Sequence, residues 1–303
     1  MRAAESGSDV YTRAEAGRCS IELTSGPMSD ASFQPPPVAQ PLPPSVCVLM
    51  TLHNRARYVG AAVRSVLTQT MSDFRLIIVD DGSTDQAPDI AEQLARDDQR
   101  SSGRDRVTVE RAGAIGRFAA LRRAHEIAEQ LAPRALLGWV DSDDLLVDTA
   151  LEETIAYLTN QPACGMVYTQ HLLIDENTRL SGLGPRCLAK YSATALLLDF
   201  LTHHFRLFRP EVYKVVGGVD ATYKTAGDYD FCLRVSEQAR IDHLPRPLYC
   251  YRVHADSISL GRRAEQTTSA ARAITAALNR RGLADRLQLV VTPASTFELV
   301  PRT

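Results

Sequence analysis

The sequence lacks the cysteine pairs and the basic charge that mark several common protein classes. Its six cysteines among 303 residues include no Cys-x-x-Cys pair. This scatter favours buried thiols in a reducing compartment over a zinc site or a disulfide framework. The formal net charge is only −2, so nucleic acid is not an expected partner.

Long hydrophobic runs are also missing. The longest candidate, residues 193–201, is too short to span a bilayer and contains Asp199. The N-terminus has no apolar core of the kind that a secretory signal requires. We therefore expect a cytoplasmic protein and leave peripheral association with a membrane open; the oligomeric state stays unknown at this point.

Two glycine-rich phosphate-binding motifs are absent as well. No Gly-x-Gly-x-x-Gly follows the first predicted strand, and no Gly-x-x-x-x-Gly-Lys loop occurs. These absences argue against a dinucleotide-dependent oxidoreductase and against a P-loop NTPase.

The residues that are present predict an α/β fold. Residues 1–44 are small, polar and rich in proline, and they predict a disordered tail. Short apolar runs then alternate with helical patterns, which is typical of a doubly wound, mostly parallel sheet. The predicted strands of this part are residues 46–50, 74–79, 107–109 and 135–140.

After residue 158 the regular alternation ends. We expect a smaller subregion there, followed by a C-terminal helix and tail over residues 261–303. Its predicted strands are residues 165–168, 171–174, 205–208 and 248–253, its predicted helices are 211–216, one opening at 226 and 262–281, and residues 181–186 are predicted to be a loop.

Carboxylates follow two of the predicted strands. Asp80 and Asp81 end one, and Asp141 and Asp143 end another. In doubly wound sheets ligands bind outside the carboxyl ends of the strands, so both clusters should face one crevice. Asp141 and Asp143 share a face of an extended chain and repel each other unless a cation lies between them. Mg²⁺ or Mn²⁺ would suit such oxygen ligands. The alternative is an acidic loop in which Asp144 or Asp148 caps the next helix.

Several motifs in a fixed order resemble family 2 glycosyltransferases, which are nucleotide-sugar enzymes of the GT-A fold. The resemblance covers about residues 45–260, with 45–144 as the nucleotide-binding half and 145–260 as the acceptor-binding half. The matching segments are 48–54 with Thr51, 79–85, Asp141-Ser142-Asp143-Asp144, Gly217-Gly218-Val219-Asp220, Gly227-Asp228-Tyr229-Asp230 with Arg234, and 251–259.

The resemblance implies that Thr51 and Asp81 hold uracil. An ionised carboxylate only accepts hydrogen bonds, so Asp81 could read the N3–H of uracil and favours UDP over CDP. His53 stands where many relatives have a tyrosine that stacks on the base. Asp80 and Asp81 could instead serve the turn and the start of the next helix, where Ser83 or Thr84 is the expected cap.

The resemblance also implies a metal site and a catalytic base. Asp143 matches the direct metal ligand and Asp141 a contact to ribose or metal, while His254 would approach the metal or the diphosphate. Asp228 matches the base that removes a proton from the acceptor hydroxyl. Its alternative role is a carboxylate favoured by the positive end of the helix dipole. Asp230 and Arg234 are expected to pair across one helical turn.

Other charged residues receive weaker assignments. Arg117 follows a glycine loop and could meet phosphate, although a solvated arginine at a helix start is the favoured interpretation. His125 and the pair His203-His204 lack the spacing of a zinc site and are interpreted as structural. Gly227 replaces an acidic residue that is common before the base in the family.

The leading hypothesis is a metal-dependent, inverting transfer of one hexose or N-acetylhexosamine from a UDP-sugar to an acceptor hydroxyl. The Gln-x-x-Arg-Trp signature of processive synthases is missing, since Trp139 is the only tryptophan. One alternative is a protein that binds a nucleotide sugar without catalysis. Another is a nucleotidyltransferase, which needs a glycine- and lysine/arginine-rich loop after the first strand. Residues 52–58 contain Arg55 and Arg57 but no glycine. The acceptor is expected to contact residues 182–208.

Overall fold

The computed structural model describes residues 46–255 and 262–302. The chain divides into residues 1–34 and 35–303, and every described residue belongs to the second unit. Two sequence predictions, the disordered tail over 1–44 and the last motif from Asp256 onward, lie outside the described residues.

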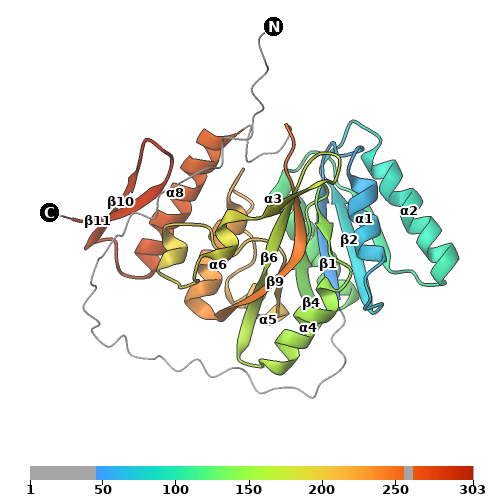
Figure 1. The fold of residues 1–303 in the computed structure, drawn as a ribbon, viewed down its shortest axis with the longest axis horizontal. Coiled ribbons are helices and arrows are strands. Elements are labelled where there is room, and N and C mark those ends of the chain that lie inside the picture. The colour runs from blue at the N-terminus through green and yellow to red at the C-terminus, as the bar shows by residue number, and fades with distance from the viewer. Residues whose placement is uncertain (1–45, 256–261, 303) are drawn as a thin grey trace, which may run out of the picture. The chain divides into compact units, whose positions relative to one another are not determined.

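The first half of the described chain alternates strands and helices, as the apolar pattern predicts (Figure 1). Each strand is a short run of branched and apolar side chains, and each helix has an apolar stripe. The elements are β1 (Val46–Leu52), α1 (Val59–Leu67), β2 (Phe74–Asp80), α2 (Ala87–Ser102), β3 (Val107–Arg111), α3 (Arg117–Leu131), β4 (Leu136–Trp139), β5 (Leu145–Leu146) and α4 (Ala150–Asn160).

The second half differs from its prediction in three places. The two strands expected over residues 165–174 are one continuous strand, the predicted loop over 181–186 includes a strand, and the C-terminal segment ends in a hairpin. The elements are β6 (Cys164–Ile174), β7 (Leu180–Leu183), η2 (Pro185–Leu188), η3 (Ala195–Leu197), β8 (Arg206–Phe208), α5 (Pro210–Val215), α6 (Gly227–Gln238), β9 (Arg240–Arg252), α8 (Arg263–Arg280), β10 (Leu287–Val291) and β11 (Phe297–Pro301).

The strands form a mixed sheet in the order β3-β2-β1-β4-β8-β6-β9-β5. β1 pairs in parallel with β2 and β4, and β2 pairs in parallel with β3. β8 is antiparallel to both β4 and β6, and so joins the two halves of the sheet. The carboxyl ends of β1, β2 and β4 therefore meet at one edge, which confirms the doubly wound α/β fold.

Alternating side chains divide the core into two layers. On β1, Cys47 and Leu49 face the layer that contains α3, α6 and α8, and Val48 and Met50 face the layer that contains α1, α2 and α4. All four side chains are fully buried, so both faces of β1 are covered, as parallel strands require. Within the described residues, no helix is both long enough and apolar enough to cross a membrane.

Two local features position the loops that follow the strands. Gly82 has φ +72°, and a Cβ there would lie 2.7 Å from the backbone nitrogen of Ala114, so glycine lets two loops touch. The backbone N–H of Ala87, at the start of α2, donates to Asp85 at 3.0 Å. The expected cap by Ser83 or Thr84 is therefore wrong, because Asp85 is closer to the helix start.

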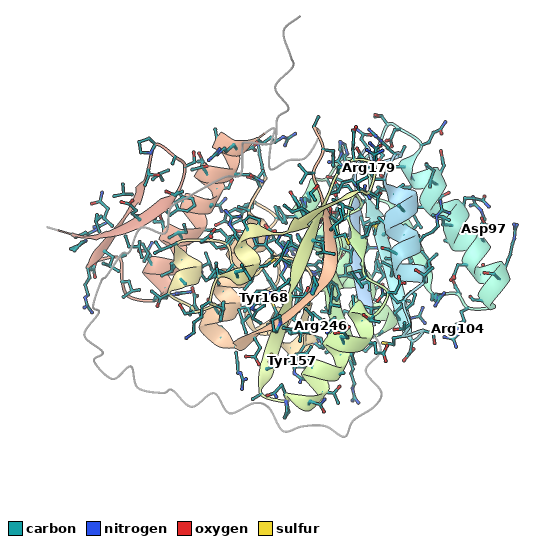
Figure 2. All side chains as sticks on the ribbon, in the orientation of Figure 1. Asp97, Arg104, Tyr157, Tyr168, Arg179 and Arg246 are labelled. Carbon is teal, nitrogen blue, oxygen red and sulfur yellow. The ribbon has the colours of Figure 1, made fainter. Side chains whose placement is uncertain are left out.

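A hydrogen bond also connects α4 to the sheet. The side chain of Tyr157 on α4 reaches toward strand β9, where its hydroxyl bonds Asp242 (Figure 2).

Candidate functional site

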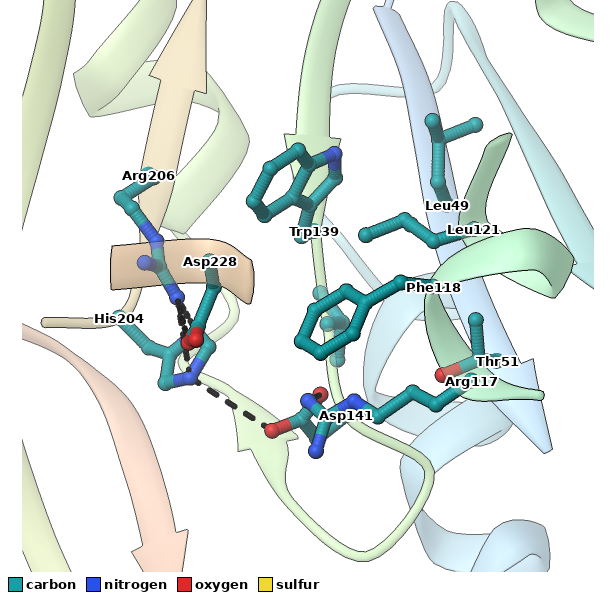
Figure 3. A pocket seen from close by; sticks show the side chains of 11 residues that line it. Leu49, Thr51, Arg117, Phe118, Leu121, Trp139, Asp141, His204, Arg206 and Asp228 are labelled. Carbon is teal, nitrogen blue, oxygen red and sulfur yellow. Dashed lines mark hydrogen bonds and ion pairs between the residues drawn. The ribbon is translucent and has the colours of Figure 1, made fainter. Parts of the chain in front are cut away.

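The edge formed by β1 and β4 opens into a small pocket (Figure 3). Its volume is about 10 Å³, which is space for roughly one water molecule. The pocket is therefore too small for a sugar ring, which would have to lie at its mouth. The lining residues come from five segments: Leu49, Thr51, Arg117, Phe118, Leu121, Trp139, Val140, Asp141, His204, Arg206 and Asp228.

Three carboxylates cluster where β4 ends. Asp141, Asp143 and Asp144 each offer an oxygen within 4.8 Å of the others. Oxygen ligands of this kind fit Mg²⁺ or Mn²⁺. Asp141 and Asp143 suit the ligand role, since each is partly exposed.

Asp144 is a buried support of this cluster. The hydroxyl of Tyr249 donates to its Oδ2 at 2.8 Å, and the backbone N–H of Arg252 donates to its Oδ1 at 2.7 Å. The same hydroxyl accepts the backbone N–H of Asp141 at 3.1 Å. Burial, followed by the nearby charges of Asp143 and Asp141, raises the pKa of Asp144. The interpretation of Asp144 as a helix cap is wrong, because its oxygens bind strand β9 instead.

Asp143 lies between two cationic or polar partners. Burial alone would raise its pKa, but the hydrogen bond from His254 and the charge of Arg55 outweigh burial and lower the pKa to about 2. Arg55 Nε lies 2.8 Å and His254 Nε2 3.1 Å from the same oxygen, Oδ2. His254 is therefore beside the carboxylate cluster, where the family resemblance expects it.

Arg117 contacts the acidic residues after β4, and the loop that precedes it is bound by the carboxylate of Asp81 after β2. Its guanidinium lies 2.7 Å from Asp141, and the charge of Asp141 raises the pKa of Arg117. The carboxylate of Asp81 accepts the backbone N–H groups of Ile115 and Gly116 at 2.8 and 2.6 Å, both through Oδ1. The interpretation of Arg117 as a solvated residue is wrong, since Asp81 fixes the loop that directs it to Asp141.

The other predicted nucleotide contacts lie close by. Thr51, at the end of β1, lines the pocket. His53 is exposed, and its Nδ1 lies 2.7 Å from the backbone oxygen of Asp81. Thr51, His53 and Asp81 thus surround the point where β1 and β2 end.

Asp228 occupies the first turn of α6 and lines the same pocket as Asp141. The expected pair of Asp230 and Arg234 is confirmed, with two contacts of 2.8 and 2.9 Å. Phe118 explains the departure at Gly227, because a Cβ there would lie 2.9 Å from the phenylalanine ring. An acidic side chain at Gly227 would require this ring to move.

Two further residues extend the site beyond the sequence prediction. His204, interpreted as structural, has Nε2 3.5 Å from Asp141 Oδ2. Burial and the charge of Arg206 lower the pKa of His204, which keeps it neutral. Arg206 lies 3.5 Å from Asp228. No local sequence pattern predicts that His204 or Arg206 belongs to the site. The one signal in the sequence is the polar pair His203-His204 beside an apolar strand.

The sequence of this chain matches the model of a known family. The model for glycosyl transferase family 2 matches residues 47–217, which is more than half of the chain. A hyaluronan synthase of Pasteurella multocida is 27% identical over 240 residues, covering 79% of this chain and 24% of that protein. The O-antigen biosynthesis glycosyltransferase WbnJ of Escherichia coli is 28% identical over 218 residues, covering 70% of this chain and 81% of that protein. The chain spans a third or less of the length of the synthases that it matches.

Solved structures share the fold. TarS of S. aureus in complex with UDP-GlcNAc has a TM-score of 0.62 at 18% identity, with 78% of this chain and 67% of that chain covered. The mannosyltransferase PcManGT of Pyrobaculum calidifontis in complex with GDP-Man and Mn²⁺ has a TM-score of 0.59 at 18% identity, with 82% and 68% covered. With the family match and the carboxylate geometry taken together, the chain belongs to glycosyl transferase family 2.

Proposed function

We propose that the protein transfers a single hexose or N-acetylhexosamine from a UDP-sugar to an acceptor hydroxyl, with inversion and with help from a divalent cation. The observation that carries this proposal is that Asp228 and Asp141 line one pocket, although 87 residues separate them in the sequence. Candidate base and candidate metal ligand thus face the same reacting centre.

The nucleotide would lie over the ends of β1 and β2. Asp81 uses Oδ1 for the backbone of residues 115 and 116, while Oδ2 has no hydrogen-bond partner among the described residues. That oxygen suits the N3–H donor of uracil. TarS, crystallised with UDP-GlcNAc, and PcManGT, crystallised with GDP-Man, have the same fold, so the choice of UDP rests on Asp81.

Asp141, Asp143 and His254 would hold the cation. Bound there, Mn²⁺ or Mg²⁺ would neutralise charge on the diphosphate leaving group. Arg55 and Arg117 already lie against these carboxylates and are placed to contact the diphosphate when it binds. Guanidinium groups suit this task because they pair with phosphate oxygens through two parallel hydrogen bonds.

Asp228 would act on the acceptor. Its carboxylate takes the proton of the acceptor hydroxyl while that oxygen forms a bond to the anomeric carbon of the sugar. The bond from the anomeric carbon to the UDP oxygen breaks in the same step, and UDP leaves with the bonding electrons. Residues 182–208 are the candidate acceptor contacts, because in the sequence they lie between the carboxylate cluster after β4 and Asp228.

The test is UDP release from UDP-glucose, UDP-galactose and their N-acetyl forms, with a panel of hydroxyl acceptors in Mn²⁺ or EDTA. We expect turnover that requires the metal and a fall of about 10²-fold or more in kcat for Asp228→Asn and for Asp143→Ala. Asp73→Asn, an exposed carboxylate away from the pocket, is the control and should match wild type. Turnover in EDTA, or full activity of Asp228→Asn, would contradict the proposal.

Two other outcomes identify the alternatives. UDP binding by calorimetry without turnover on any acceptor would indicate a nucleotide-sugar-binding protein. Release of pyrophosphate from a nucleoside triphosphate would indicate a nucleotidyltransferase.

A further inference from the structure

Arg206 of β8 is an arginine with no exposed surface, and it is the largest fully buried side chain among the described residues. Burial opposes its charge, but the negative charge of the neighbouring Asp228 favours it, and the pKa of Arg206 is raised. The side chain is therefore a buried cation. Such a charge is costly unless a carboxylate or several acceptors compensate it.

One carboxylate lies within ion-pair distance of Arg206, and Asp141 of the same pocket acts on it from further away. Among the ion pairs of the described residues, Arg206 has Asp228 as its sole partner, at 3.5 Å. The remaining contacts are neutral: the sulfur of Cys232 at 3.5 Å, the ring of His204 at 3.1 Å, and the faces of Trp139 and Phe200 at 5.4 and 5.3 Å. The aromatic rings favour a cation in this position.

Structural arginines in this fold behave differently. Arg106 makes two contacts of 2.8 and 2.9 Å with Asp98. Arg234 pairs with Asp230 and also donates to two backbone carbonyls. Arg209 donates to the carbonyls of Cys164 and Leu158 at 2.9 and 2.8 Å. Among the described residues, Arg206 has no such hydrogen bond to the backbone, and its Nε has no partner there.

We propose that Arg206 is a positioning residue that fixes the carboxylate of Asp228 toward the acceptor. This inference rests on the proposed function. The 3.5 Å separation leaves the carboxylate oxygen able to accept a proton, whereas a tight two-bond pair would occupy it. A fully buried cation held in one position provides a fixed field at the base.

The charged and titratable groups that face Asp228 come from four segments: Arg117 of α3, Asp141 after β4, His204 and Arg206 before and on β8, and Cys232 of α6 itself. Burial keeps His204 and Cys232 neutral at physiological pH. Arg117 is already paired with Asp141. Arg206 is therefore the cation that forms an ion pair with Asp228.

The test compares Arg206→Met, which removes the charge at similar volume, with Arg206→Lys, which retains it. We expect Arg206→Met to lower kcat by about 10- to 100-fold while KM for the UDP-sugar changes by less than about threefold, because Arg206 does not touch the nucleotide. Arg206→Lys should recover part of kcat, because it retains the charge beside Asp228.

Arg209→Met is the matched control, since it removes a structural arginine three residues away. It should lower stability and leave kcat and KM unchanged. Wild-type kcat in folded Arg206→Met, or the same fall in kcat in Arg209→Met, would overturn the positioning role while wild-type turnover stands. If Arg206→Met does not fold, Arg206→Gln decides, because unchanged kcat in that second uncharged variant would also overturn the role. Absence of UDP release by wild type would overturn the proposed function and this inference together.

Discussion

Replacing Tyr249 by phenylalanine should loosen the carboxylate cluster without changing the shape of the core. Tyr249 is fully buried, and its hydroxyl both donates to Asp144 at 2.8 Å and accepts the backbone N–H of Asp141 at 3.1 Å. Each buried polar group left without its partner costs about 1–3 kcal/mol. Two such groups give an expected loss of about 2–6 kcal/mol in the free energy of unfolding. The affinity for Mn²⁺ should fall about 10- to 100-fold, as for other residues that support metal ligands.

Urea unfolding followed by fluorescence measures the first effect, since Trp139 is the only tryptophan and lies at the site. Titration with Mn²⁺ by calorimetry measures the second. Tyr157→Phe is the control: its hydroxyl bonds Asp242 at 3.1 Å in a half-buried position, so its loss should cost about 1 kcal/mol or less. A Tyr249→Phe protein within about 0.5 kcal/mol of wild type and with unchanged Mn²⁺ affinity would refute the reasoning.

Three other predictions test the loop, a buried ion pair and the response to acid. Gly82→Ala should cost more than Gly103→Ala in urea unfolding and should also weaken UDP binding, because both glycines have positive φ but only Gly82 is crowded by another loop; equal costs would refute this. Asp98→Ala should cost about 3–5 kcal/mol, against about 0–1 kcal/mol for the exposed Glu176→Ala; the pairs are buried and exposed respectively. Burial, aided by Arg186, lowers the pKa of His171 from 6.5 to about 4. Between these pH values the unfolded state binds a proton that the folded state does not, so the free energy of unfolding should fall as pH drops from 6.5 toward 4, by up to about 1.4 kcal/mol per pH unit for this group. A flat urea midpoint over this range, or the same slope in His171→Gln, would contradict this prediction.

The local sequence was informative where a pattern reports its own structure. Apolar runs predicted β1, β2 and β4, and the carboxylates after them fell at one sheet edge because parallel strands end together. The pair of Asp230 and Arg234 followed from helical spacing alone. The second half was harder, because β6 continues through a stretch whose polar residues suggested a break, and hydrogen bonds to β8 and β9 hold it extended.

The sequence by itself determined the strand and helix pattern of residues 46–160 and the acidic residues at its strand ends, since periodicity and turn chemistry depend only on near neighbours. Tertiary structure alone decided that Arg206 lies behind Asp228, that Tyr249 holds Asp144 and that Arg55 meets Asp143. These partners are 22 to 105 residues apart. Their meeting depends on the insertion of antiparallel β8 beside β4 and on the return of β9 past the cluster, and strand order of this kind is set by the packing of the whole sheet, which no local pattern encodes.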